Sequence, residues 1–371
     1  MRAILCVLLF SFISAAFAQT KSEVPKILYL SRKTQSGDRI DKTAFYVGDT
    51  SCSTKKLISE DVNEPPALSS KKLKVAYLKG LEIFVCDING EDQKLIYKCE
   101  SKYMGGQKSF MSINSVPVWS PDDSKILFTK MNVEPRLNRR YLQKNMMCIV
   151  DLKTNSIDSF EVNKLLREIY WVGESQLIYC RNYKKPWIDA KREWPTDFYT
   201  RLYSFDLKTK TEKVLTDSTM IVFGNVICMK TKKIAFYSYP QRQLFIMNFD
   251  GTGIKQITHV KNSDTLNDGK GVGAPVFSPD GKKIAFTFKT KDRESDIVVI
   301  NVDGSDFKVV TENHSIRYGP KQITWSKDSE WVITREQYSY ETGILKMFSA
   351  DGTKMKELKN ASCLNSFFIW L

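Results

Sequence analysis

One short unit recurs along the chain and constrains its fold more than any other feature. Residues 274–286 read Ala-Pro-Val-Phe-Ser-Pro-Asp-Gly-Lys-Lys-Ile-Ala-Phe. The apolar ends are typical of β-strands, and Ser-Pro-Asp-Gly is typical of a type I turn, because Pro sets φ, Asp bonds nearby backbone and Gly adopts the left-handed region. Residues 116–128 and 323–333 repeat the unit in more divergent form. Each copy therefore predicts strand, tight turn, strand.

Each unit continues into two further strand-like segments, so that the full repeat holds four short strands. Six complete units follow one another at residues 66–97, 117–161, 169–216, 220–258, 275–311 and 322–358. Four of them place a hairpin dipeptide between the last two strands: Asn89-Gly90, Asp250-Gly251, Asp303-Gly304 and Asp351-Gly352. Short strands at this regular spacing predict an all-β repeat architecture.

The two ends of the chain complement each other. Residues 26–58 contain three strand-like segments without a first strand, and residues 365–370 form one spare apolar strand. A ring of sheets removes its open edge when the last strand joins the first blade. We therefore predict a β-propeller of seven four-stranded blades, closed by the C-terminal strand in the N-terminal blade. Six or eight blades are the alternatives.

The repeat resembles the TolB-type propeller repeat, also called WD40-like. The resemblance covers residues 26–371, and the full motif stands only at 274–286, since Asp123 and Lys327 replace the Gly and the Pro of the other copies. It implies one propeller domain over residues 19–371. The α/β domain that precedes the propeller in TolB has no room here, which weakens any transfer of TolB's role in the cell envelope to this chain.

Two related propeller families carry chemistry that this sequence does not reproduce. The prolyl-oligopeptidase-type enzymes carry an α/β-hydrolase domain, and no Gly-x-Ser-x-Gly elbow occurs here. Some oligogalacturonate lyases bind a metal through several histidines, whereas this chain has only His259 and His314. We therefore expect no metal and no cofactor.

The first 18 residues are typical of a secretory signal peptide. Arg2 precedes an apolar run from Ile4 to Ile13, and Ala16-Phe17-Ala18 supplies a small-x-small cleavage site. The run is shorter than the roughly 20 residues that span a bilayer. We expect cleavage after Ala18, a secreted or periplasmic protein, and no membrane span in the mature chain.

The net charge of the chain limits the classes of partner that it is expected to bind. The formal net charge of +14 at pH 7, of which Arg2 leaves with the signal, favours acidic partners, with a solvated basic surface as the alternative. We expect no nucleic-acid partner.

Seven cysteines remain once Cys6 is removed with the signal peptide. We expect four to be buried hydrophobes, namely Cys86, Cys148, Cys180 and Cys228, and we expect Cys52, Cys99 and Cys363, in polar turns, to be available for a disulfide.

Two insertions mark a candidate binding surface. Residues 130–145 and 181–200 lengthen the same connection, from second to third strand, in adjacent units, so we expect both on one face of the ring. They interleave basic and aromatic side chains, which suit anionic groups and sugar rings or peptides. The predicted binding residues are Arg136, Arg139, Arg140, Tyr141, Tyr183, Lys184, Lys185, Trp187, Lys191, Arg192, Trp194 and Tyr199.

Three functional hypotheses follow. The first is a binding module for a protein or an anionic carbohydrate on the face with these insertions, and no residue pattern requires catalysis. The second is a polysaccharide lyase or hydrolase at the channel mouth, with Arg139, Lys185 or Arg192 binding uronate and Tyr183 or His314 transferring a proton. The third is a scaffold for envelope proteins. The fold alone does not decide between them, and a self-packed flap is the structural alternative for the insertions.

Overall fold

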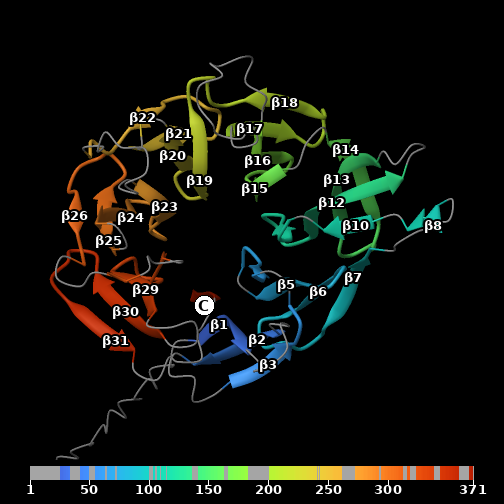
Figure 1. Cartoon of the computed structure of the whole chain (residues 1–371), viewed down its shortest axis with the longest axis horizontal. Coiled ribbons are helices and arrows are strands. Elements are labelled where there is room, and N and C mark those ends of the chain that lie inside the picture. Colours follow the sequence, from blue (N-terminus) through green and yellow to red (C-terminus); the bar gives the residue numbers. More distant parts are fainter. Residues whose placement is uncertain are drawn as a thin grey trace, which may run out of the picture.

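The structure, a computed structural model, is a ring of antiparallel sheets (Figure 1). It describes residues 26–33, 42–49, 55–62, 65–71, 73–99, 103–104, 107–108, 110–113, 115–135, 141–162, 166–182, 200–239, 241, 243–260, 272–291, 294–311, 316–317, 323–337, 343–358 and 367–370. These residues form strands and turns without any helix, so no helix among them is long and apolar enough to cross a membrane.

Seven blades follow the ring, which confirms the predicted seven-bladed β-propeller. Blade 1 holds β32 (Phe367–Trp370), β1 (Lys26–Lys33), β2 (Lys42–Asp49) and β3 (Lys55–Ser59). Blade 2 holds β4 (Ala67–Leu68), β5 (Lys74–Lys79), β6 (Glu82–Asp87) and β7 (Lys94–Lys98). Blade 3 holds β10 (Phe110–Ile113) with β11 (Val118–Trp119), then β12 (Lys125–Pro135), β13 (Tyr141–Asp151) and β14 (Ile157–Val162).

The other four blades follow in chain order. Blade 4 holds β15 (Leu166–Trp171), β16 (Gln176–Asn182), β17 (Thr200–Asp206) and β18 (Thr211–Val214). Blade 5 holds β19 (Ile221–Cys228), β20 (Lys233–Tyr239), β21 (Gln243–Asn248) and β22 (Lys255–Gln256). Blade 6 holds β23 (Val272–Phe277), β24 (Lys283–Lys291), β25 (Glu294–Asn301) and β26 (Lys308–Val309). Blade 7 holds β28 (Ile323–Trp325), β29 (Trp331–Gln337), β30 (Gly343–Ser349) and β31 (Met355–Leu358).

The last strand of the chain closes the ring. β32 pairs antiparallel with β1 in a register from Ile27 opposite Trp370 to Leu30 opposite Phe367. The sheet order β3-β2-β1-β32 makes the C-terminal strand the innermost strand of blade 1. The predicted closure is therefore confirmed, and β1 has no open edge over this stretch.

The core consists of apolar layers between neighbouring blades. Successive side chains of a strand point to opposite faces, so β20 serves two layers: Ile234 and Phe236 pack toward blade 4, and Ala235 packs toward blade 6. All three are fully buried. Burial of each large apolar side chain contributes roughly 1.5–3 kcal/mol to the stability of the fold. This explains why the second strand of each repeat keeps an apolar run.

The two faces of the ring differ in their connections. We call the turn face the one on which the turns joining strands 1 to 2 and 3 to 4 open, and the junction face the one with the connections from strand 2 to 3 and from blade to blade. On the turn face, consecutive blades touch through their turns. Asp123 of blade 3 accepts hydrogen bonds from the main-chain N–H groups of Ser70 (2.7 Å) and Lys71 (3.1 Å) of blade 2.

One expectation needs correction, and two connections between blades contain short strands. Residues 130–145 are not a free loop, since β12 and β13 continue their pairing from Lys130 opposite Met146 to Pro135 opposite Tyr141, leaving 136–140 outside the described residues. The long ladder satisfies the backbone that a loop would leave to solvent. The connection 99–114 likewise contains β8 (Tyr103–Met104), β9 (Gln107–Lys108) and β10, and β27 (Ile316–Arg317) pairs with β25.

The described cysteines are buried. Cys86, Cys148, Cys180 and Cys228 lie in the core as expected, and Cys99, expected in a polar turn, is also a buried thiol, only 5% exposed. The chain after β7 turns inward at Cys99, whose N–H donates to the oxygen of Leu81. Cys52 and Cys363 lie outside the described residues.

Candidate functional site

Most of the predicted binding residues lie outside the part of the chain that the structure describes. Tyr141 is the exception, since it begins β13 opposite Pro135. The others are Arg136, Arg139, Arg140, Tyr183, Lys184, Lys185, Trp187, Lys191, Arg192, Trp194 and Tyr199. The described ends of these connections are Pro135 and Tyr141 in blade 3, and Asn182 and Thr200 in blade 4. Because both blades have the same strand order, these ends lie on the junction face.

A small pocket opens at the junction end of blades 4 and 5, where β16 ends and β17 begins. Its volume is about 70 Å³, and it is lined by Arg167, Glu168, Cys180, Thr200, Val222, Phe223 and Gly224. Thr200 is the residue at which the 183–199 connection rejoins the blade. The pocket thus includes the described residue that follows the 183–199 connection, which the sequence analysis predicts to be a binding segment.

Two β-bulges in neighbouring blades shape this pocket. The register of β15 shifts between Arg167 and Tyr170, and that of β19 shifts between Phe223 and Val226. Glu168 and Gly224 take positive φ values of 49° and 56° within these bulges. Glu168 is not a glycine, so its left-handed backbone is strained, and such strain is retained where the surrounding structure fixes it. The bulges present Glu168 to the space between the blades.

Asn225 joins the two bulges by three hydrogen bonds. Its main-chain N–H donates to Glu168 Oε2 (3.2 Å), and its main-chain oxygen accepts from the hydroxyl of Tyr170 (2.6 Å). The thiol of Cys180 donates to Asn225 Oδ1 (2.8 Å). Asn225 is only 1% exposed, and its Nδ2 has no partner in the described structure. A buried donor without an acceptor costs about 1–3 kcal/mol.

Desolvation by the surrounding residues dominates the electrostatics of this cluster. Although Glu168 as a residue is exposed, partial desolvation of its carboxyl group raises its pKa above the ordinary glutamate value, against the lowering effect of the hydrogen bond from Asn225. Burial also raises the pKa of Cys180 well above that of an exposed thiol, with a further contribution from the charge of Glu168. Cys180 is therefore a neutral thiol and no nucleophile. Glu168 is a carboxyl group whose charge is incompletely compensated.

The nearby Arg181 has a structural role. Its guanidinium lies over the ring of Tyr203, 4.2 Å from the centroid, and forms an ion pair with Glu212, which also accepts the hydroxyl of Tyr179. Arg181 lies opposite Arg201 across the β16–β17 ladder. With its charge matched by Glu212, Arg181 stabilises blade 4 and contributes little to the attraction of an anionic ligand.

No group of three or more His, Cys, Asp or Glu side chains among the described residues is arranged to hold a metal ion. The sequence did not single out Glu168 or Asn225, because a bulge leaves no signal in hydrophobic spacing. Only the register shift shows that these side chains meet.

Comparison with known proteins supports the propeller fold but does not assign the chain to a family. No protein-family profile matches the chain. A curated relative, dipeptidyl-peptidase 5 of Trichophyton schoenleinii, is 31% identical over 134 residues, which is 34% of this chain and 18% of the relative. The chain thus matches less than a fifth of that enzyme's length.

Solved structures agree with the propeller. The β-propeller domain of the trilobed protease from Pyrococcus furiosus aligns with a TM-score of 0.58 at 14% identity, covering 92% of this chain and 94% of that domain. Oligogalacturonate lyase in complex with manganese aligns with a TM-score of 0.61 at 11% identity, covering 88% of this chain and 97% of the lyase. At these identities the similarity shows the fold alone. The propeller fold is supported, whereas membership of the TolB-type repeat family stays a prediction.

Proposed function

We propose that this chain is an exported propeller that binds a protein or an anionic carbohydrate on its junction face, over blades 3 to 5. The observation that carries the proposal is the pair of bulges at Glu168 and Gly224, which line a small pocket of mixed polar and apolar character at Thr200, where the 183–199 connection rejoins blade 4. Bulges of this kind are retained next to binding sites because they re-aim side chains.

The strand lengths of blade 3 agree with this face. β12 and β13 each have 11 residues, whereas β5 and β6 of blade 2 have 6 each. The extra residues extend the hairpin at its junction end, beside the insertion of blade 4. The similarity to peptidase propellers favours a polypeptide partner, and the excess of Lys and Arg in the sequence favours an acidic one.

The test is binding of residues 19–371 to immobilised acidic and neutral glycans and to acidic and basic peptide arrays, at low and moderate salt. Four variants accompany it: Arg139→Ala/Arg140→Ala, Trp187→Ala/Trp194→Ala, Arg167→Ala and Glu168→Gln. The charge-matched control is Lys153→Ala/Lys282→Ala, because both lysines are exposed on the turn face. We expect salt-sensitive binding that the Arg139→Ala/Arg140→Ala, Trp187→Ala/Trp194→Ala and Arg167→Ala variants weaken, that Glu168→Gln does not weaken because it removes a negative charge from the pocket, and that the control preserves. Binding that survives the three weakening variants contradicts the proposal.

A polysaccharide lyase or hydrolase is the second candidate. Its support is the fold shared with oligogalacturonate lyase. Incubation with polyuronates, followed by ultraviolet detection of unsaturated products and by reducing-end analysis, distinguishes the two: a binding module leaves the polymer intact, and product formation that Tyr183→Phe or His314→Ala abolishes favours the enzyme.

A further inference from the structure

The turn between the first two strands of blade 4 is one residue shorter than its counterparts. Trp171 lies opposite Leu177, six positions on, whereas Trp119 lies opposite Ile126 and Trp325 opposite Val332, each seven positions on. The equivalent pairs in blades 2, 5 and 6 are also seven apart. Blade 4 therefore stands out among the blades whose first two strands are joined by such a turn.

The shortened turn also lacks the serine that organises the turns of blades 3, 6 and 7. In Ser120, Ser278 and Ser326, the hydroxyl oxygen accepts a hydrogen bond from a main-chain N–H. The same hydroxyl group donates a hydrogen bond to the aspartate of the turn. Val172 occupies this place in blade 4, where its N–H donates to the oxygen of Gln176. A hydrophobic side chain cannot form the serine hydrogen bonds, so the turn has a different shape.

A contact between blades is lost at the same place. Trp119 Nε1 donates to the oxygen of Ala67 (2.9 Å) and Trp325 Nε1 to that of Val276 (3.0 Å), each in the preceding blade. Trp171 is only 6% exposed, and its Nε1 has no acceptor among the described residues. Trp171 therefore has a buried donor where Trp119 and Trp325 have a hydrogen bond between blades.

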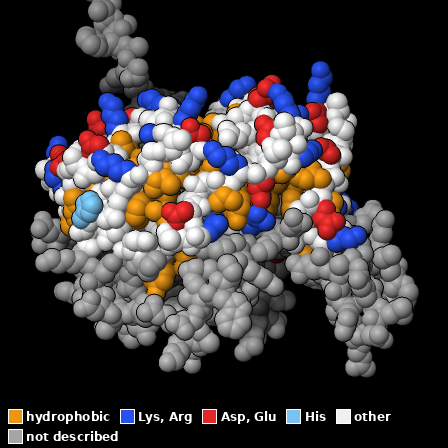
Figure 2. Space-filling view, turned by 90° about the horizontal axis from the view of Figure 1, so that it is seen from above, with side chains coloured by type: hydrophobic (Ala, Val, Ile, Leu, Met, Phe, Trp, Pro, Cys, Tyr) orange, Lys and Arg blue, Asp and Glu red, His pale blue; other side chains and the backbone are white. Residues whose placement is uncertain are grey.

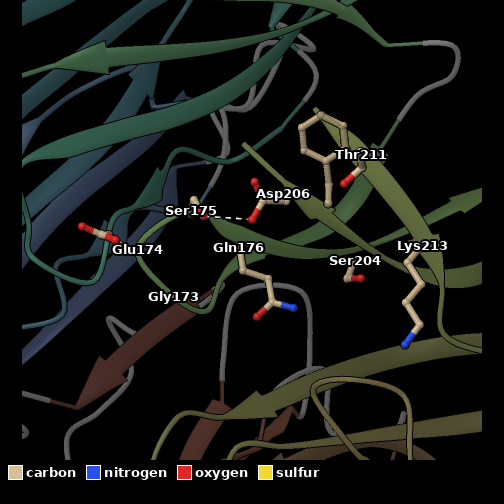
Figure 3. A pocket seen from close by; sticks show the side chains of 9 residues that line it. Gly173, Glu174, Ser175, Gln176, Ser204, Asp206, Thr211 and Lys213 are labelled. Carbon is tan, nitrogen blue, oxygen red and sulfur yellow. Dashed lines mark hydrogen bonds between the residues drawn. The ribbon is translucent and has the colours of Figure 1, made fainter. Parts of the chain in front are cut away.

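Two crevices flank the shortened turn on the turn face. One, of about 440 Å³, is lined by Gly173, Glu174, Ser175, Gln176, Ser204, Phe205, Asp206, Thr211 and Lys213 (Figure 3). The other, of about 300 Å³, lies toward blade 3, and its lining includes Lys125, Asp151, Asp158, Trp171, Lys208 and Lys210. Glu174 and Ser175 line both, so the turn is the wall between them. Both volumes lie within the range of small-ligand sites, about 300–1,000 Å³.

The charges of the crevices balance. Four lysines (Lys125, Lys208, Lys210, Lys213) face four carboxylates (Asp151, Asp158, Glu174, Asp206). Figure 2 likewise shows acidic and basic side chains interspersed over the described surface. Lys208 pairs with Glu174 at 2.8 Å, but both side chains are mostly exposed, so the pair is weak and can exchange for a ligand. The site thus has no net attraction for ions of either sign.

The remaining lining groups are hydroxyls and an amide over a half-buried apolar floor. Ser175 donates to Asp206 Oδ2 (3.0 Å), and Gln176, Ser204 and Thr211 surround the same crevice (Figure 3). Ile149 and Leu207 form part of the floor on the blade 3 side. Alternating donors and acceptors over an apolar floor match the hydroxyl rim and the C–H face of a sugar ring, since each polar group can satisfy a ligand hydroxyl.

We propose that the two crevices around residues 173–176 are a binding site for a neutral oligosaccharide. The site lies on the turn face, so it does not rest on the function proposed for the junction face. The two also differ in ligand chemistry, because the junction-face partner is acidic and its binding is salt-sensitive.

The test is isothermal titration of residues 19–371 with cellotetraose, xylotetraose, mannotetraose and maltotetraose, with tetragalacturonate as the charged comparison. One variant replaces residues 172–176 with the six-residue sequence of 278–283, which restores the full-length turn and fills the crevices. A second, Gln176→Leu/Thr211→Val, removes hydrogen-bonding groups without altering the turn. Lys327→Ala, exposed on the turn of blade 7, is the matched control.

We expect at least one neutral tetrasaccharide to bind, with about tenfold weaker affinity in both variants, no change in the control, and no dependence on salt. The proposal is overturned if no neutral tetrasaccharide binds at millimolar concentration, if only tetragalacturonate binds, or if Gln176→Leu/Thr211→Val binds as the unmodified protein does. The last comparison holds even when the turn replacement fails to fold.

Discussion

The indole nitrogen of Trp325 donates a hydrogen bond to the main-chain oxygen of Val276, 3.0 Å away, and so joins blade 7 to blade 6. Trp119 joins blade 3 to blade 2 in the same way, and Trp171 in blade 4 has no such acceptor. We predict that Trp325→Phe and Trp119→Phe each lower the free energy of unfolding by about 0.5–1.5 kcal/mol more than Trp171→Phe does, because only they lose a hydrogen bond between blades. Urea unfolding followed by circular dichroism measures the difference, and since the ring becomes smaller in all three variants, equal losses contradict the prediction.

Gly281 supports a second interblade contact. It has φ of +75°, and a Cβ there would lie 2.9 Å from Cys228 Sγ and 2.8 Å from Thr231 Cγ2 of blade 5. Gly80 has φ of +58° and nothing within 4 Å of the same position. Both Gly→Ala variants carry the left-handed strain of about 1–2 kcal/mol, and we predict a further loss of about 1–3 kcal/mol at Gly281 from overpacking. Thermal unfolding of the two variants, measured side by side, separates the cost of backbone strain, which both share, from the cost of overpacking, which only the Gly281 variant has.

Glu168 gives the candidate site a pH signature. Its pKa is raised in the folded protein, so the folded state holds a proton that the unfolded chain releases more readily. The sign follows from linkage: this group destabilises the fold above its folded pKa, and the penalty disappears as the pH falls below the ordinary glutamate value. We predict that Glu168→Gln is more stable than the unmodified protein at pH 7 and equally stable at pH 4. Denaturant unfolding at both pH values tests this, and a destabilised variant at pH 7 would show that the carboxylate is held in its charged form.

The described thiols should resist alkylation in the native protein. Burial raises the pKa of Cys86 to about 12 and that of Cys148 to about 11, and it raises that of Cys180 well above the usual range. At pH 8 only about one Cys148 side chain in a thousand is then a thiolate, the form that reacts. Brief iodoacetamide labelling with peptide-resolved mass spectrometry should modify these peptides only after unfolding in denaturant. Native labelling of the Cys148 peptide at the rate of a model thiol refutes the assignment.

Removal of the closing strand should weaken the whole ring. Deletion of residues 367–371 leaves β1, in which Ile27 and Tyr29 are fully buried, without its inner neighbour. We predict a loss of at least about 3 kcal/mol in the free energy of unfolding, comparable with a severe core truncation, and early proteolysis within residues 26–59. Deletion of Leu371 alone is the control, because that residue follows β32.

The repeat was readable from the sequence because its signals are local. The Ser-Pro-Asp-Gly turn, the hairpin dipeptides and the apolar spacing of residues 275–286 each depend on neighbours in the chain, and the spare strand at 365–370 indicated the closure. The extended pairing of β12 with β13 was not readable, because the strands continue through residues with no alternating apolar pattern. The burial of Cys99 was not readable either, because its neighbours in the sequence are polar. The burial depends on packing between blades 2 and 3, which lies outside the local sequence.

The candidate site was only partly predictable for the same reason. Composition indicated the face with the 181–200 connection, but Glu168 and Asn225 belong to different blades, 57 positions apart in the chain, and meet only through the register shifts of β15 and β19. The shortened turn at 172–176 was not predicted, because this unit keeps only the hydrophobic spacing of the repeat. Its consequence for the crevices needed the positions of the adjoining blades.

The pairing of β1 with β32 sets the order in which the ring can form. Blades 2 to 7 draw their main strands from neighbouring stretches of chain, whereas blade 1 joins strands that are separated by nearly the whole sequence. Local sheets form faster than such distant pairs, since loop closure must come first. Blade 1 is therefore expected to be the last to be completed, and a chain whose residues 367–370 have not yet been synthesised carries an unpaired strand edge on β1. Such an edge is a template for pairing with a second copy, so the N-terminal blade is the part of the nascent chain most exposed to misassembly.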